Sequence, residues 1–322
     1  MNHLAARLAP ALVAILVNGC GAVAPPRPFA ETLAPPHDGA RLVVVGDLQR
    51  TAPILELWRE QNDPERELIV RAIADAHPDL LAITGDCVFN GGSDGQWEAF
   101  DALVAPLHAQ HVPAIAAFGN HEYWSGRADA DDHLFPRFPL DARRHWFAFA
   151  FGPLRIVVLD ANRSHLTKGE WDAQVGWYAG ALADFDRDPA VRGVVVMFHQ
   201  PPYTNSTITG DEAYVQTDLV PPLARAKKTL AMLNGHVHNY ERFVRGGKVF
   251  VVSGGGGGPR APLATGADRR HLDDLFQGSS VRDFHFTVYT LTEAGVDAEV
   301  RGVAKGASDV HVMDRFTIAW PQ

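Results

Sequence analysis

The sequence is poor in cysteine and holds no long run of either apolar or basic residues. Two of its 322 residues are cysteine. Its N-terminal apolar stretch is too short to span a bilayer, and no run of Lys and Arg reaches the length of a nucleic-acid-binding patch. The formal net charge of -9 also argues against a nucleic-acid partner.

The composition is that of a globular protein. Hydrophobic residues make up 46% of the chain, enough for one large core or two modest ones. No internal repeat and no second composition regime is visible along the chain. We therefore expect one domain over residues 39–322.

The N-terminus reads as an export signal. Residues 1–20 contain a short apolar stretch that ends in Val17-Asn18-Gly19-Cys20, which resembles a bacterial lipobox. In that motif Cys20 becomes the lipidated first residue, and ordinary secretion is the alternative because Asn18 is unusual there. The Pro-rich residues 21–38 predict an extended tether. We expect an exported protein, either a periplasm-facing lipoprotein that touches the membrane only through Cys20 or a secreted form.

Beyond the tether, short buried strands alternate with helical stretches, which is the rhythm of an α/β domain. Strands are expected at "ARLVVVGD", "DLLAITGD", "VPAIAAFGNHE", "GVVVMFHQ" and "TLAMLNG", and two more are joined at Gly152-Pro153. One helix is expected with Asp63 as its N-cap and Pro64 at its first position. "SDGQWEAFDALVAPLHAQH" predicts another helix, and the last part of the chain is rich in strands.

Five of these strands end in side chains that can bind a metal. The endings are Gly46-Asp47, Gly85-Asp86, Gly119-Asn120-His121-Glu122, His199 and Gly235-His236-Val237-His238. Binding sites in α/β folds gather beyond the carboxyl ends of strands. One Gly-Asp ending is an ordinary turn, but five endings of this kind favour a shared site. Carboxylates, an amide oxygen and imidazoles suit divalent Zn, Mn or Fe, and there are enough of them for two ions.

The order of these blocks carries a family resemblance. "GD", "GD", "GNHE", "FHQPPYTNS" and "GHVHNYERF" resemble the calcineurin-like metallophosphoesterase superfamily, and the last two are most similar to its purple acid phosphatase branch. The resemblance implies an α/β fold: a four-layer αββα sandwich of two mixed β-sheets flanked by helices. It also implies two divalent metal ions, Fe, Mn or Zn, and hydrolysis of phosphate esters by attack of a metal-bound hydroxide on phosphorus.

The resemblance also gives each strand ending a role. It assigns Asp86 to both ions and the other ligands to one ion each: Asp47 and His238 to the first, and Asn120, His199 and His236 to the second. His121 would lie beside the leaving group, where an imidazolium can stabilise the phosphoryl charge and protonate the departing oxygen.

Two positions depart from the family pattern. Most members carry a histidine two residues after the first aspartate, where this chain has Gln49, although the purple acid phosphatases lack that histidine too. Phe89 stands three residues after Asp86, where the purple branch has the tyrosine whose phenolate binds ferric iron. Because phenylalanine has no oxygen to donate, a divalent pair or a weakly held first metal is expected instead.

Further candidates for contacting the substrate or supporting the ligands are Gln49, Asn90, Tyr203, Tyr240 and Arg242. Packing is the alternative for the two tyrosines, and a surface ion pair is the alternative for Arg242. The glycines of "SGGGGGPRAPL" allow close approach of the backbone to a phosphate, and a flexible loop is equally compatible with them.

Together these patterns predict a phosphoesterase with a small phosphorylated substrate, since local cations can override the net negative charge. The competing hypothesis is a non-catalytic metal- or ligand-binding protein on a degenerate phosphoesterase scaffold. Gln49 and Phe89 favour that alternative, while His121 and the full set of ligands for the second metal favour the enzyme.

Overall fold

The computed structural model of the chain describes residues 25–35, 37–52 and 55–321. The predicted signal peptide and Cys20 lie outside the described residues, so export and lipid anchoring stay predictions. Within these ranges, no helix has the length and apolar character needed to cross a bilayer.

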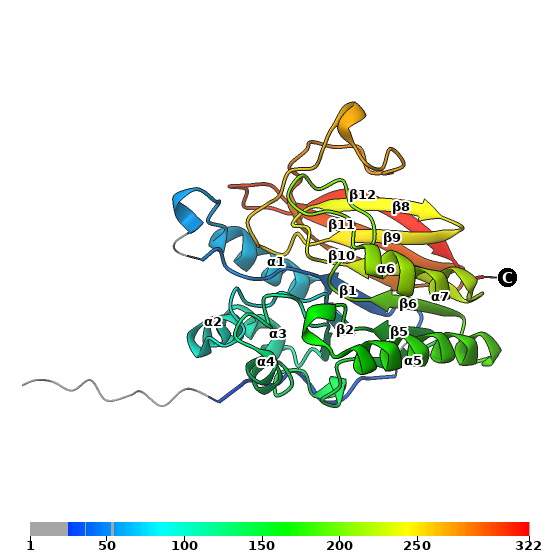
Figure 1. Ribbon diagram of the computed structural model, residues 1–322. Coiled ribbons are helices and arrows are strands. Elements are labelled where there is room, and N and C mark those ends of the chain that lie inside the picture. The colour runs from blue at the N-terminus through cyan, green and yellow to red at the C-terminus, as the bar shows by residue number, and fades with distance from the viewer. Residues whose placement is uncertain (1–24, 36, 53–54, 322) are drawn as a thin grey trace, which may run out of the picture.

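Two six-stranded sheets form the centre of the molecule (Figure 1). The first contains β1 (Arg41–Val45), β2 (Leu80–Ile83), β3 (Ala114–Ala116), β10 (Phe284–Leu291), β11 (Gly295–Val303) and β12 (His311–Ala319), in the order β12-β11-β10-β1-β2-β3. The second contains β4 (Phe147–Phe151), β5 (Leu154–Val158), β6 (Gly193–Met197), β7 (Thr229–Asn234), β8 (Tyr240–Arg245) and β9 (Lys248–Ser253), in the order β4-β5-β6-β7-β9-β8. Both sheets are mixed, because β1 pairs parallel with β2 but antiparallel with β10, and β5 pairs parallel with β6 but antiparallel with β4.

Helices cover the outer face of each sheet, on the left and on the lower right of Figure 1. Those beside the first sheet are α1 (Asp63–Asp75), α2 (Asp94–Leu103), α3 (Ala105–Ala109) and α4 (Arg127–Leu134). Those beside the second are α5 (Lys168–Arg187), α6 (Ala213–Asp218) and α7 (Val220–Arg225). Short 3-10 helices are η1 (Leu55–Leu57), η2 (Pro139–Asp141), η3 (Arg163–His165) and η4 (Gly266–Asp268).

Strand β1 shows how the sequence produces the layers. Its side chains alternate, so Leu42 and Val44 enter the core between the two sheets, while Val43 and Val45 enter the core beneath α1 to α3. All four side chains are buried, which explains why the strand reads as a continuous apolar run. The predicted four-layer arrangement of two mixed sheets flanked by helices is confirmed.

The helix boundaries differ from the sequence-based expectation by small amounts. The N-cap of α1 is Asn62 rather than Asp63. The single helix expected after Ser93 is two helices, because the chain breaks at Val104 and restarts with Pro106 in the first turn of α3. Helix α5 begins at a capping box in which Thr167 and Glu170 satisfy each other's backbone N–H groups.

Part of the segment expected to be a tether packs on the domain. Phe29 is 2% exposed, and its ring lies 4.5 Å from His108 and 5.2 Å from Phe138, between centroids. Its N–H donates to the carbonyl of Arg137 at 2.9 Å. Burial of a phenylalanine side chain stabilises by about 1.5–3 kcal/mol, so this ring fixes the Pro-rich segment to the domain ten residues before the expected boundary at residue 39.

Candidate metal centre

The predicted ligands come from both sheets and lie together at one end of the molecule. Asp47, Asp86 and Asn120 follow β1, β2 and β3 of the first sheet. His199 follows β6 of the second sheet, and both His236 and His238 follow β7. The two sheets therefore contribute equally to a site on the seam between them.

Three of these residues adopt the left-handed backbone conformation. The φ angle is 59° at Asp47, 55° at Asp86 and 69° at His236. Such angles are uncommon for residues other than glycine, and they concentrate at functional sites where the surrounding structure holds them. Close packing is one such restraint, since a Cβ atom at Gly85 would lie 2.7 Å from the backbone nitrogen of Gly119.

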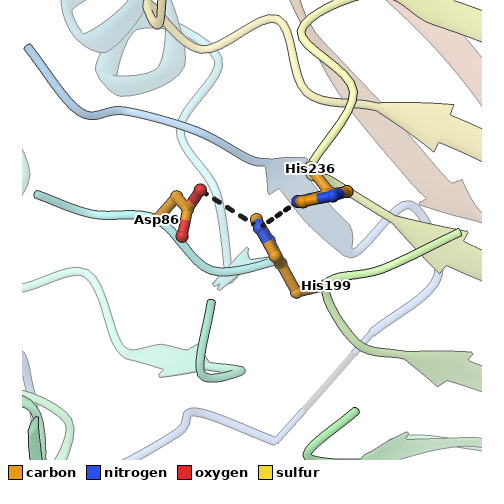
Figure 2. Close-up of side chains that lie close together, drawn as sticks. All are labelled: Asp86, His199 and His236. Carbon is orange, nitrogen blue, oxygen red and sulfur yellow. Dashed lines mark hydrogen bonds and ion pairs between the residues drawn. The ribbon is translucent and has the colours of Figure 1, made fainter. Parts of the chain in front are cut away.

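One group of ligand atoms surrounds His199. Its Nε2 lies 3.1 Å from Asp86 Oδ2 and 3.2 Å from His236 Nδ1 (Figure 2). The amide oxygen of Asn120 lies 3.1 Å from His199 Nε2 and 2.9 Å from His236 Nδ1. Because His199 Nδ1 faces the carbonyl of Thr84 at 2.8 Å, the neutral tautomer carries its proton on Nδ1 and turns the lone pair of Nε2 inward.

These contacts favour a positive charge at the centre of the group. A carboxylate oxygen, an amide oxygen and two imidazole nitrogens face one another, and their lone pairs repel at such distances unless a cation or a proton lies between them. Burial would lower the pKa of His199, but the carboxylate of Asp86 raises that pKa to about 10. Burial, with His199 next to it, lowers the pKa of His236 to about 3. The donor set thus fits a divalent metal ion that replaces the proton on His199.

A second group of ligand atoms contains Asp47, Asp86 and His238. His238 Nε2 lies 3.2 Å from Asp47 Oδ1, and its Nδ1 faces the carbonyl of Pro259 at 2.9 Å, which again leaves Nε2 for a metal. In each group the ligand atoms of the three His and Asp side chains lie within 4.8 Å of one another, and Asp86 belongs to both. The geometry therefore provides two adjacent candidate sites that share one carboxylate.

His121 and Gln49 lie beside the shared carboxylate. The backbone N–H of His121 donates to Asp86 Oδ1 at 3.0 Å, and its ring Nε2 lies 4.0 Å from Asp86 Oδ2. Its Nδ1 faces the carbonyl of Phe89 at 2.6 Å. With its amide nitrogen turned toward Asp86, Gln49 donates to Asp86 Oδ2 at 3.1 Å and accepts from His121 Nε2 at 3.3 Å. Both ring nitrogens of His121 thus face hydrogen-bond acceptors.

Glu122 has a role that the sequence analysis did not assign. Its fully buried carboxylate accepts hydrogen bonds from the backbone N–H groups of Asp86 at 2.9 Å, Cys87 at 2.8 Å and Gly119 at 2.7 Å. Glu122 therefore fastens the loop after β2 to the loop after β3, and so positions Asp86 and Asn120. Burial and the nearby Asp86 raise its pKa to about 7. The sequence signal that could have identified Glu122 was its position in "GNHE", directly after the candidate site residues Asn120 and His121.

The glycine-rich loop after β9 packs against the ligands of the first site. A Cβ atom at Gly254 would lie 2.7 Å from Asp47 Oδ2, and one at Gly258 would lie 2.4 Å from His238 Cε1. The N–H of Gly258 donates to the carbonyl of Asp47 at 2.9 Å. The glycines thus permit close approach of the loop backbone to the candidate metal-ligating side chains Asp47 and His238.

Four of the additional candidates lie away from the metal ligands. Asn90 caps the turn before α2, where its side chain accepts from Gly92 N at 3.1 Å. Tyr203 lies under the guanidinium of Arg245, 3.8 Å from its ring centroid. Tyr240 and Arg242 both bind the carboxylate of Asp314, at 2.9 and 2.8 Å. Their side chains are engaged in packing and ion pairs, so Gln49 alone of the five additional candidates contacts the site.

A cavity of about 160 Å³ opens onto the ligands and is lined by Arg59, Asp86, Asn120, His121, Ser206, Ile208, Thr209, His236, Val237, His238 and Ala261. It is smaller than the roughly 300–1,000 Å³ of pockets that enclose a drug-sized molecule. The cavity is therefore suited to the head of a small ligand.

Two proteins of similar sequence bear the name purple acid phosphatase. The chain is 26% identical to purple acid phosphatase 15 of Arabidopsis thaliana, over 73% of this chain and 47% of that protein. It is 24% identical to the probable inactive purple acid phosphatase 9 of the same plant, over 54% of this chain and 31% of that protein. The chain thus spans a third to a half of the length of these relatives.

A solved structure shows the same fold. The purple acid phosphatase from yellow lupin (Lupinus luteus) seeds aligns with a TM-score of 0.66 and 22% identity, over 91% of this chain and 55% of that one. The family model described as calcineurin-like phosphoesterase matches residues 40–240, which include every ligand of both candidate sites. Because this match covers more than half of the sequence, the chain belongs to the calcineurin-like phosphoesterase family.

Proposed function

We propose that this protein hydrolyses phosphate esters at a centre of two divalent metal ions. The observation that carries the proposal is the carboxylate of Asp86, which is shared by two groups of metal-ligating side chains and lies beside His121. Asp47 and His238 would hold one ion, and Asn120, His199 and His236 would hold the other. Such a pair of ions supplies Lewis acidity and a nucleophile for displacement at phosphorus.

The protein's own residues orient the groups and deliver a proton. Thr84 and Pro259 fix the tautomers of His199 and His238 through their carbonyls, so that both imidazoles present Nε2 to the centre. His121 lines the cavity, and because its Nδ1 faces the carbonyl of Phe89, Nε2 is the ring nitrogen that remains for proton transfer. A proton on that nitrogen can pass to the oxygen of the leaving group.

The second candidate function is a metal- or ligand-binding protein without catalytic activity. One similar protein bears the name probable inactive purple acid phosphatase 9, so the scaffold is associated with an inactive member. In this chain Gln49 and Phe89 occupy positions where most members of the family or of its purple branch have functional side chains. His121 and its contacts with Asp86 favour hydrolysis.

Metal analysis combined with an ester assay separates the two functions. Purified protein loaded with Mn, Zn or ferrous iron is expected to hold two ions per chain and to hydrolyse an aryl phosphate or its bis-ester. Asp86→Ala should reduce both the metal content and kcat/KM, the latter by at least about 100-fold, since changes to residues outside the ligand shell already cost 10- to 100-fold.

The control variant is Asp184→Ala, which removes a carboxylate whose side chain is 71% exposed on α5. It should leave metal content and activity unchanged. Full activity in Asp86→Ala would contradict the proposed centre. Two bound ions with no hydrolysis of either ester would favour the non-catalytic alternative.

A further inference from the structure

Two residues that line the cavity above the candidate metal ligands carry hydrogen-bonding atoms with no partner. Arg59 Nε and Thr209 Oγ1 are both buried, and neither makes a hydrogen bond with any described residue. Both residues line the cavity together with Asn120, His121 and His236. An unsatisfied buried polar atom destabilises a protein by about 1–3 kcal/mol, so two of them in residues that line one cavity favour a ligand that supplies acceptors.

The loop that carries Thr209 is held in place from outside the cavity. Arg270 donates to three carbonyls of this loop, those of Thr204 at 2.9 Å, Ser206 at 2.6 Å and Thr209 at 3.0 Å. The N–H of Thr209 donates to Ser206 Oγ at 3.2 Å. Thr209 is therefore fixed by contacts that do not use its own hydroxyl, and a fixed backbone is what a preorganised donor requires.

The segment that carries Arg59 is anchored in a similar way. The next residue, Glu60, forms an ion pair with Arg260 at 2.7 Å, and its carbonyl accepts from Thr51 Oγ1 at 2.5 Å. Arg260 lies at the end of the glycine-rich loop, so this pair connects the Arg59 segment to the metal centre. Of the described residues that line the cavity, Arg59 is the one arginine or lysine.

The residues that line the cavity are complementary in charge and in hydrogen-bonding character. The metal-ligating side chains present oxygen and nitrogen lone pairs, whereas Arg59 and Thr209 are hydrogen-bond donors. A phosphoryl group suits such a lining, because its oxygens can bind metal ions and also accept hydrogen bonds. A guanidinium also matches the geometry of phosphate oxygens better than an ammonium does.

Resting on the proposed function, we infer that Arg59 and Thr209 form an oxyanion subsite that makes phosphate monoesters the preferred substrates. A monoester presents three non-bridging oxygens and up to two negative charges to the subsite and the metal ions. A diester replaces one of these oxygens with an ester oxygen that bears a second organic substituent. The small cavity would then place that substituent against the donors and leave them unsatisfied.

The test measures binding and catalysis in the same variants, Arg59→Ala, Arg59→Lys and Thr209→Val, each checked for retained metal. Inorganic phosphate is titrated into the metal-loaded protein by calorimetry, and KM and kcat are measured for an aryl phosphate and its bis-ester. Arg59→Ala should raise the phosphate Kd and the monoester KM by about 10- to 100-fold, the range for losing a hydrogen bond to a charged group. The wild-type preference for the monoester should shrink in parallel.

The other variants separate charge from geometry. Arg59→Lys should recover part of the loss, since it keeps the charge but not the fork of donors, and Thr209→Val should show a smaller loss of phosphate binding. The control is Arg71→Ala, which removes the same charge from an exposed pair with Glu67 on α1. It should leave the phosphate Kd unchanged.

The outcomes distinguish this inference from the proposed function. If phosphate binding depends on Arg59 in a protein that hydrolyses neither ester, the proposed function is contradicted but the phosphate subsite is supported. If the monoester is hydrolysed and Arg59→Ala leaves KM and the phosphate Kd unchanged, the subsite is contradicted but the proposed function is supported. A wild-type preference for the bis-ester would also overturn the inference, and a protein that neither binds phosphate nor hydrolyses either ester would overturn both.

Discussion

At the scale of single residues, Phe89 distinguishes this chain from the purple acid phosphatases that it resembles. Its ring centroid lies 4.9 Å from that of His121 and 4.6 Å from that of Trp124, and its carbonyl accepts from His121 Nδ1. The side chain therefore packs beside the metal centre and offers no oxygen ligand. This contact keeps an apolar wall next to His121.

The absence of a phenolate predicts the colour of the protein. Because the purple colour of the related enzymes comes from a tyrosinate bound to ferric iron, the protein loaded with iron should show no intense visible band. The measurement is a visible spectrum with iron content determined in parallel, and Phe89→Tyr is the matched comparison. An intense purple colour in the unmutated protein would mean that another tyrosine supplies the phenolate and that the alignment of the second sequence block is wrong.

The sequence predicted which candidate ligands lie together better than it predicted which other side chains line the cavity beside them. Residues such as Asp86 and His199 follow recognisable strands, and strand ends in an α/β fold converge, so a local pattern was sufficient to bring them together. Arg59 and Thr209 lie on loops whose approach to the centre depends on distant ion pairs, such as the one between Glu60 and Arg260. The periodicity of apolar residues along the chain does not reveal such contacts between distant segments.

At the scale of elements, Glu241 connects strand β8 to the loop that lines the cavity. Its carboxylate accepts from Thr204 Oγ1 at 2.5 Å and from the N–H of Asn205 at 2.8 Å. The side chain is fully buried. Strand β8 itself was not predicted, because its first four residues lie inside the block "GHVHNYERF", which was interpreted as part of the site. The strand thus supports the loop that carries Thr209.

Glu241 should make the stability of the fold depend on pH. Burial raises its pKa to about 7, compared with an ordinary value of 4.5. Between these two values the folded protein binds a proton that the unfolded chain has lost, so the free energy of unfolding falls as pH rises through this window, by at most about 3 kcal/mol. Glu241→Gln does not titrate and should flatten that fall.

Urea unfolding of the metal-free protein at several pH values between 4.5 and 8 measures the effect. Glu67→Gln is the control, since the side chain of Glu67 is 61% exposed on α1, and its pH profile should match that of the unmutated protein. An unchanged slope in Glu241→Gln would show that the carboxyl of Glu241 ionises near its ordinary pKa in the folded state.

At the scale of the whole molecule, the candidate metal centre lies where the two sheets meet. Asp47 and Asp86 come from the first sheet, and His199, His236 and His238 come from the second, so each candidate site has ligands from both. The apolar core between the sheets packs them together over a wide area. The candidate metal ligands add a specific connection at one end of that interface, where the backbone adopts uncommon conformations.

This arrangement predicts that removing metal weakens the entire fold. A ligand that binds only the folded state stabilises it by about 2.7 kcal/mol at a concentration 100-fold above its Kd, and for a domain of this size that corresponds to a shift of about 4 to 5 °C in the unfolding midpoint. Differential scanning calorimetry before and after chelation should show this decrease, and added Mn or Zn should reverse it. Asp86→Ala should unfold at a midpoint that does not depend on metal, because it lacks the carboxylate that both groups share. If the midpoint stayed constant while metal analysis showed that the ions had left the wild-type protein, the two sheets would be held together by their apolar core alone.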